Sequence, residues 1–150
     1  MDYIDLSRIF EQETENFIYH NPKGLWVSVA GIHDWQHYCL KNNIHLEKLK
    51  SEFQIKLKPR AKILNIHNSR TFHYFLNKYT YYSEGIALKG DNYTLNLSIK
   101  WEQIIRDYQG LIIPKLLPKY NNLGAWYYIW HCTCGCIWDL QAVEKTIKLK

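Results

Sequence analysis

Apolar and polar residues alternate, or recur with a short period, in a series of segments along this chain. Residues 3–6 alternate and predict a first short strand, and residues 25–29 form the compact apolar run of a buried strand. Residues 53–57 alternate as a half-exposed strand does, while residues 62–66 and 111–113 indicate two more strands. The chain is therefore predicted to build a sheet from short strands.

Three segments have the spacing of helices. Residues 33–42 place Trp35, Tyr38 and Cys39 on one stripe, with Asp34 near the positive N-terminal end of the helix dipole. The other two helices are predicted from their caps and ends: Asn68 or Ser69 before a helix that reaches Tyr79, and Ser98 before a helix that stops at Gly110.

The most distinctive stretch is residues 125–140, AWYYIWHCTCGCIWDL, which is rich in aromatic and β-branched residues. We interpret it as a strand, a tight turn at Gly135 and a second strand, with the glycine where a bulge or a close backbone approach excludes a side chain. This hairpin is predicted to be the central pairing element of the sheet. Strands and helices are grouped rather than strictly alternating, which predicts a single α+β domain over residues 1–150 with a split mixed or antiparallel sheet.

Composition and charge narrow the class of protein. The chain has 150 residues and a mass of 18.0 kDa, enough to bury a core without disulfides or metals. Its formal charge is +5, and its basic residues are scattered, apart from an alternating run at residues 56–62 and a terminal cluster at residues 145–150. We interpret these runs as a solvated strand edge and a tail, because lysine protects strand edges from pairing, rather than as a nucleic-acid footprint.

The first ten residues carry Asp2, Asp5 and Arg8 where a secretory signal needs an apolar segment. No apolar run approaches the roughly 20 residues of a membrane span. We therefore expect a cytoplasmic protein with no membrane partner, in which the four cysteines are thiols rather than a disulfide framework.

The cluster of His131, Cys132, Cys134 and Cys136 resembles a metal site at first sight. On a strand, however, alternate thiols form a row about 7 Å apart, which cannot wrap a tetrahedral zinc ion as Cys-x2-Cys knuckles do. His131 points to the opposite strand face from Cys132, so it is not placed to activate that thiol. No metal is expected, and the phosphate-binding loops and nucleophile elbows of common enzymes are absent from the sequence.

Five signatures in the same order resemble the small ADP-ribosyltransferase-like proteins of bacteria, phages and large viruses. The resemblance covers nearly the whole chain. The matching segments are PKGLWVS at residues 22–28, Asp34-Trp35 followed by Tyr38-Cys39, KIL at residues 62–64, WEQIIRDYQGLII at residues 101–113 and WYYIWHCTCGCIWD at residues 126–139.

This resemblance implies a split sheet that holds NAD+ as co-substrate in the cleft between its halves. It implies that Ser28 supports the nicotinamide end, that Trp26 or Tyr128 stacks on a ring, and that Asp5 occupies the first-strand position, where His or Arg is common. For the polar and acidic catalytic positions it implies His131 and Asp139, with Glu84 and Glu102 as less favoured acids. The candidate catalytic residues are thus Ser28, His131 and Asp139, and the candidate NAD-binding residues are Asp5, Trp26, Ser28 and Tyr128.

The activity implied is transfer of ADP-ribose from NAD+ to a macromolecular acceptor, with protein favoured over nucleic acid, in a conflict between a host and a virus or bacterium. The host cytoplasm is then an alternative location. Asp5 and His131 differ from the residues expected at their positions, so an inactive relative that acts as a binding or inhibitory protein is the alternative function. A third possible function is that of a nucleic-acid-binding domain, whose affinity for nucleic acid would fall steeply with salt concentration.

Overall fold

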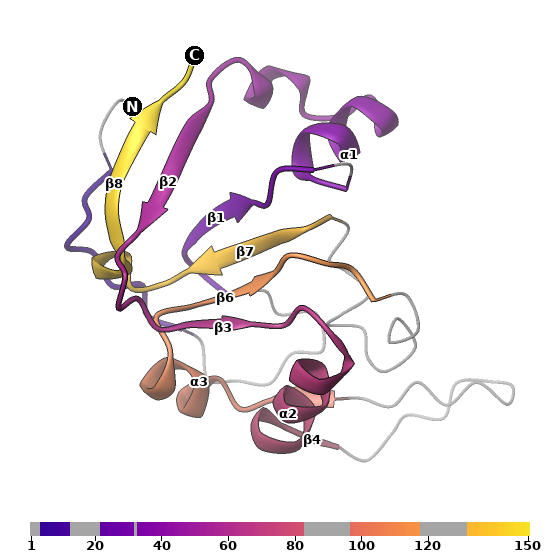
Figure 1. Cartoon of the computed structure of the whole chain (residues 1–150), viewed down its shortest axis with the longest axis vertical. Helices are drawn as coiled ribbons and strands as arrows, with labels where there is room; N and C mark the ends of the chain where they lie inside the picture. Colours follow the sequence, from indigo (N-terminus) through magenta and orange to yellow (C-terminus); the bar gives the residue numbers. More distant parts are fainter. Residues whose placement is uncertain (1–3, 13–21, 32, 83–96, 118–131) are drawn as a thin grey trace, which may run out of the picture.

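The computed structural model describes residues 4–12, 22–31, 33–82, 97–117 and 132–150. Within them the fold is α+β, as predicted, with a mixed four-stranded sheet in the order β1-β7-β6-β3 (Figure 1). Its strands are β1 (Leu25–Ser28), β7 (Cys134–Ile137), β6 (Gly110–Ile113) and β3 (Ile63–Asn65). β7 is antiparallel to both neighbours, and only β3 and β6 are parallel. β7, which belongs to the predicted hairpin at residues 125–140, is therefore a central strand of the sheet, as expected.

Two smaller sheets complete the β structure. β2 (Phe53–Leu57) pairs with β8 (Val143–Lys148) in an antiparallel ribbon that rises from one end of the main sheet in Figure 1. β4 (Thr80–Tyr82) pairs with β5 (Leu97–Ile99). The C-terminal residues, predicted to be a tail, are thus a strand, which pairs with β2 from Lys148 opposite Phe53 to Val143 opposite Leu57, with a register shift beside Leu57.

The predicted turn at Gly135 is wrong. Gly135 lies inside β7, opposite Val27 of β1 and Ile112 of β6, so the strand runs through it. The reason for a glycine is the close approach of the neighbouring backbone, since a Cβ here would lie 2.7 Å from the carbonyl oxygen of Leu111. The first arm of the predicted hairpin, residues 125–131, lies outside the described residues.

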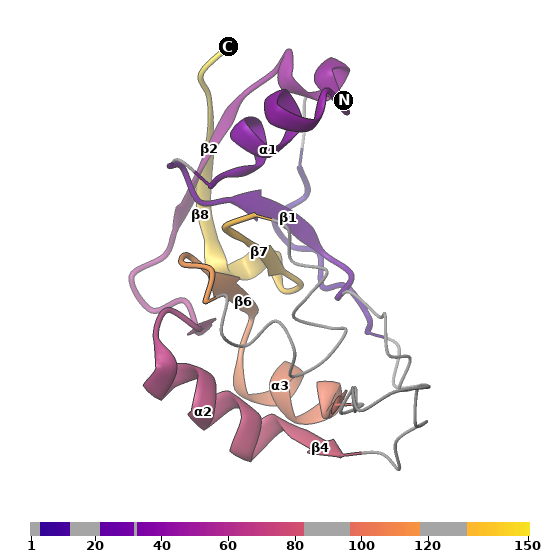
Figure 2. The same ribbon diagram turned by 90° about the vertical axis from the view of Figure 1, so that its right-hand side faces the viewer.

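The described residues form three α-helices: α1 (Trp35–Asn42), α2 (Ser69–Tyr79) and α3 (Trp101–Asp107). Figure 2 shows α1 above the strands of the main sheet and α2 and α3 below them. Of the two predicted caps, Asn68 is the one that caps α2, and it forms a capping box with Thr71. The predicted cap at Ser98 is wrong: Ser98 pairs with Tyr81 in the β4–β5 ladder, and Lys100 is the residue before α3.

The main sheet has a buried core on each face. The helix-side core contains Phe72, Phe75, Ile104, Leu111 and Trp138, and the ribbon-side core contains Ile137, Leu140, Ala142 and Val143. Trp138 holds the helix-side core in place. Its indole N–H donates a hydrogen bond to the Tyr108 carbonyl (2.9 Å), and its ring packs edge-on against the ring of Trp101. β7 is thus packed on both of its faces. Because β1 pairs with β7, this packing also fixes the position of Trp26 and Ser28 on β1.

The predicted strand at residues 3–6 is wrong for the described residues 4–6. There the Asp5 carboxylate accepts hydrogen bonds from the Ser7 amide (3.0 Å) and hydroxyl (2.6 Å), which folds the segment into a turn. Ile4 and Leu6 still pack against the ribbon-side core. No helix among the described residues has both the length and the apolarity to cross a membrane.

Candidate functional site

The candidate site lies at the edge of the main sheet formed by β1. Trp26 is opposite Cys136 and Ser28 is opposite Cys134, and residues opposite each other on antiparallel strands share a face. Trp26 and Ser28 therefore project from the same face of the sheet as the helix-side core. Trp26 is 42% exposed and Ser28 is also exposed, so β1 alternates rather than being buried as predicted.

Ser28 anchors the start of α1. Its hydroxyl oxygen accepts a hydrogen bond from the Trp35 amide at 2.9 Å. Thr133, which directly precedes β7, binds the segment between β1 and α1. Its amide donates to the His33 carbonyl (2.8 Å), and its hydroxyl donates to the Val29 carbonyl (3.0 Å). The end of β1, the start of β7 and the first turn of α1 thus form one hydrogen-bonded corner.

Asp34 and His37 are the most chemically distinctive pair in this corner. Asp34 caps α1: its carboxylate accepts from the His37 amide (2.9 Å), the Gly31 amide (2.9 Å) and the His37 ring at Nδ1 (2.8 Å). The Asp34 side chain is 11% exposed, whereas that of His37 is 58% exposed. A buried carboxylate therefore holds a solvent-facing imidazole in a fixed orientation.

Electrostatics assign the proton in this pair. Burial acts to raise the pKa of Asp34, but the donors from His37 and Gly31 outweigh it and hold the pKa below its usual value. An ionised carboxylate only accepts, so we assign the hydrogen to Nδ1 of His37. Nε2 is the ring nitrogen that Asp34 does not use, which is the arrangement of an imidazole that a carboxylate holds for general base catalysis.

The thiols next to this corner are buried, and their environments shift their pKa values in different directions. All four cysteines are free and buried, and Cys132, Cys134 and Cys136 follow one another at alternate positions. Burial raises the pKa of Cys136 to about 12, while a hydrogen bond from Cys134 lowers the pKa of Cys132 against the effect of burial. The described residues contain no group of three or more His, Cys, Asp or Glu side chains that could hold a metal ion.

Asp139 lies away from the corner. Its carboxylate accepts from the Gln141 amide (3.0 Å) and the Gln109 side chain (3.1 Å), and so caps the short helix η3 (Leu140–Ala142). Asp139 is five residues beyond Cys134, the partner of Ser28, which corresponds to roughly 16 Å of extended chain. The structure therefore does not bring Asp139 together with Ser28.

Asp5 lies at the same end of the sheet as Asp139. The N-terminal segment runs beside the end of β7, where the Leu140 amide donates to the Arg8 carbonyl (3.0 Å) and Ile9 forms a bridge with Asp139. Asp5 is exposed, and the Ser7 hydroxyl lowers the pKa of its carboxyl. The predicted residues Tyr128 and His131, and the less favoured Glu84, lie outside the described residues. Glu102 is in the first turn of α3.

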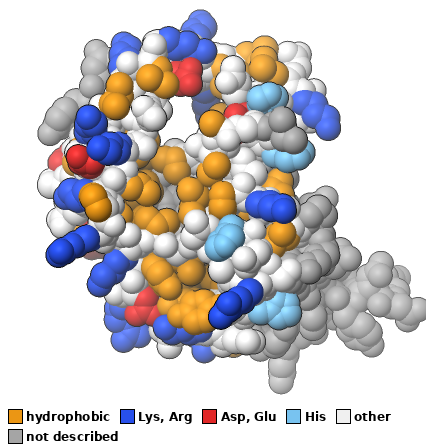
Figure 3. Space-filling model, viewed as in Figure 1, with side chains coloured by type: hydrophobic (Ala, Val, Ile, Leu, Met, Phe, Trp, Pro, Cys, Tyr) orange, Lys and Arg blue, Asp and Glu red, His pale blue; other side chains and the backbone are white. Residues whose placement is uncertain are grey.

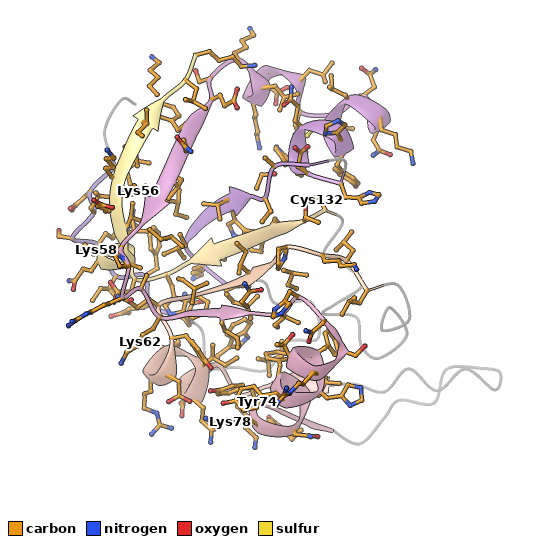
Figure 4. All side chains as sticks on the ribbon, viewed as in Figure 1. Lys56, Lys58, Lys62, Tyr74, Lys78 and Cys132 are labelled. Carbon is orange, nitrogen blue, oxygen red and sulfur yellow. The ribbon has the colours of Figure 1, made fainter. Side chains whose placement is uncertain are left out.

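A second polar cluster joins α2 to α3, in the lower part of Figure 4. The Tyr79 hydroxyl donates to Asp107 (2.6 Å), and Lys78 lies 3.5 Å from Asp107 and 3.1 Å from the Tyr74 hydroxyl. The Lys78 hydrogen bond lowers the pKa of Tyr74, whereas burial raises the pKa of Tyr79. Every polar group named here has a partner within the cluster, so we interpret it as a connection between the two helices.

The Asp34–His37 pair is the feature that sequence reasoning did not assemble. The sequence contains the pair as Asp34 followed three residues later by His37. Predicting their contact requires knowing that Asp34 is the N-cap residue of α1. Comparisons of the chain with protein-family models, curated proteins and solved structures find no match.

Proposed function

We propose that this chain is an NAD-dependent ADP-ribosyltransferase or an NAD-binding relative, with NAD+ bound at the β1 edge of the sheet. One observation carries the proposal. The signature segments at residues 22–28, 101–113 and 126–139 are far apart in sequence, yet their described parts include the adjacent strands β1, β6 and β7. Signatures that converge in space are expected when they specify one structural unit.

The glycines of these signatures support the same interpretation. A Cβ at Gly24 would collide with the Ile137 carbonyl oxygen, and a Cβ at Gly110 would lie 2.8 Å from the carbonyl oxygen of Cys136. Glycine in two of the signatures is thus required by close packing against the third. The three segments are physically interdependent, and they position Trp26 and Ser28 on one face.

In the proposed reaction the bond between nicotinamide and the ribose carbon breaks, and its electron pair leaves with nicotinamide. The acceptor's nucleophilic atom bonds to the ribose carbon and loses a proton. Trp26 would stack on the nicotinamide ring, and the fixed corner at Ser28 would orient the ribose. Nε2 of His37 would take the acceptor's proton, with Asp34 stabilising the resulting imidazolium.

Calorimetric titration with NAD+ tests binding. Trp26→Ala is expected to weaken binding by about tenfold or more, because the stacking surface is lost. Tyr74→Ala is the matched control, since Tyr74 is 46% exposed and lies on α2, away from β1. Folded wild-type protein that shows no heat of binding at millimolar NAD+, or equal losses in both variants, would contradict the proposal.

The alternative is a non-catalytic relative that acts as a binding or inhibitory protein. Two observations favour it: the Ser28 hydroxyl is engaged by the Trp35 amide, and the Asp139 carboxylate is engaged in capping η3. Labelled NAD+ incubated with the protein and host lysate separates the two functions. Labelled acceptors that disappear with His37→Gln support the transferase, whereas partners retained without any label support the binding protein.

A further inference from the structure

The β2–β8 ribbon unites the two basic runs of the sequence. In its register Lys56 is opposite Lys145 and Phe53 is opposite Lys148, although these pairs are far apart in the chain. We define the basic ribbon as residues 50–62 and 143–150, which comprises both strands and the connection toward β3. In the space-filling view of Figure 3, Lys and Arg side chains follow the left margin of the molecule, over this ribbon.

The basic ribbon accounts for the net positive charge of the protein. It has eight Lys or Arg residues and two Glu residues, a formal charge of +6. The complete chain has a formal charge of +5, so the rest of the chain carries −1. A basic chain in which one ribbon holds all the excess charge has a localised field rather than a generally basic surface.

Most of these cations are uncompensated. The two acidic residues are each in one ion pair, Glu144 with Lys56 (3.1 Å) and Glu52 with Lys150 (3.5 Å). Among the described residues no ion pair is found for the remaining charged side chains of β8 and of the connection: Lys58, Arg60, Lys62, Lys145 and Lys148. Lys56, opposite Lys145, is paired with Glu144, so Lys145 is the cation of this cross-strand pair for which no ion pair is found.

The arrangement fits a linear polyanion. Figure 4 shows Lys56, Lys58 and Lys62 one after another down the same side of the molecule. Lys56 belongs to β2, Lys58 directly follows the strand and Lys62 directly precedes β3, so the line of cations runs from the ribbon into the connection. Residues 58–62 contain no large apolar side chain, whereas Phe53, Ile147 and Leu149 of the basic ribbon are exposed, so the polyanion site is assigned to the connection and the lysines beside it.

We propose that the basic ribbon binds the sugar-phosphate backbone of a nucleic acid, independently of sequence. The inference does not rest on NAD+ binding, since the ribbon packs through the ribbon-side core, on the sheet face opposite Trp26 and Ser28. Five uncompensated cations that each neutralise one phosphate predict a slope of log affinity against log salt near −4.5 for duplex DNA. Affinity would then fall about 500-fold between about 50 and 200 mM salt.

Fluorescence anisotropy with a labelled duplex of arbitrary sequence, and with one of its strands, tests this. The ribbon variant is Lys58→Gln, Arg60→Gln, Lys145→Gln and Lys148→Gln; the control variant is Lys41→Gln, Lys48→Gln, Arg70→Gln and Lys115→Gln. Both remove the same charge from exposed side chains. The ribbon variant should lose about tenfold or more in affinity, and its duplex slope should become shallower by about 3.6. The control should change by less than about threefold.

Three results would overturn the inference: no binding of either nucleic acid at low salt, equal losses in both variants, or equal binding of polyglutamate or phosphatidylserine vesicles. The last result would indicate an acidic protein or a membrane surface as the partner. Circular dichroism of both variants establishes that they are folded. Since NAD+ is absent from these measurements, their failure leaves the NAD+ proposal intact.

Discussion

Gly135 lies where β7 is held between two strands, and its environment leaves no room for a side chain. Gly135→Ala is expected to lower the free energy of unfolding by about 2–3 kcal/mol, because the new methyl group must push back the backbone of Leu111 and Ile112. Urea unfolding measures this loss. Gln54→Ala, at an exposed position of β2, should change stability by less than about 0.5 kcal/mol. Equal effects at the two positions would refute the close approach.

Asp34 combines a helix cap with the support of His37. Asp34→Ala should cost about 1–2 kcal/mol at about pH 7, because two backbone amides and one imidazole lose their acceptor. Burial acts to raise the pKa of Asp34, but the hydrogen bonds from His37 and Gly31 hold it below its usual value in the folded protein. Its stabilising effect is therefore complete above that value and is lost as the pH falls through the folded pKa.

The difference in unfolding free energy between wild type and Asp34→Ala should consequently shrink on going from about pH 7 to about pH 3. Denaturant titrations at the two pH values measure it. A difference that stays constant, or grows in acid, would show that the carboxylate is not stabilised in the folded state.

At the scale of elements, Tyr79 and Asp107 connect α2 with α3. Tyr79→Phe removes one hydroxyl from a buried ring and should cost about 1 kcal/mol in unfolding free energy. Because Asp107 is the partner, Asp107→Asn should add little when introduced into the Tyr79→Phe variant. Fully additive losses would mean that the two side chains act separately.

The sequence predicted correctly those elements whose caps and apolar stripes lie within one continuous segment. The α2 helix was predictable because its cap, Asn68, and its apolar stripe of Phe72, Phe75 and Tyr79 are contained in one segment. The prediction that Ser98 caps a helix was wrong because Ser98 lies in β5, which pairs with β4. The prediction of a turn at Gly135 was wrong because β7 pairs with β1 and β6, which come from distant segments of the chain. Tertiary pairing overrode local preference in each failure.

The candidate site was predictable in part for the same reason. Ser28 and Trp26 follow from the alternation of one strand, so their shared face could be expected from the sequence. The separation of Ser28 from Asp139 depends on the β1–β7 register, which no local pattern fixes. The Asp34–His37 pair needed the position of the helix start, and the basic ribbon needed the pairing of β2 with β8.

At the scale of the whole molecule, the four thiols report on the integrity of the fold. Cys39, Cys132, Cys134 and Cys136 are all buried, and burial raises the pKa of Cys39 and of Cys136. Native protein should therefore react with less than about one equivalent of a thiol reagent within minutes near neutral pH, and with all four after unfolding in guanidinium. Rapid reaction of several thiols in the native state would show that the helix-side core is open.

The basic ribbon packs against the face of the main sheet opposite the one that carries Trp26 and Ser28, so the two proposed activities can be measured separately. Of the two, NAD+ binding at β1 is the central claim. The most direct measurement is a crystal structure of the protein with NAD+. We predict the nicotinamide ring against Trp26 and the adjoining ribose within reach of Ser28 and of Nε2 of His37. A structure with NAD+ bound elsewhere, or with packed side chains filling the space over Trp26 at saturating NAD+, would contradict the account.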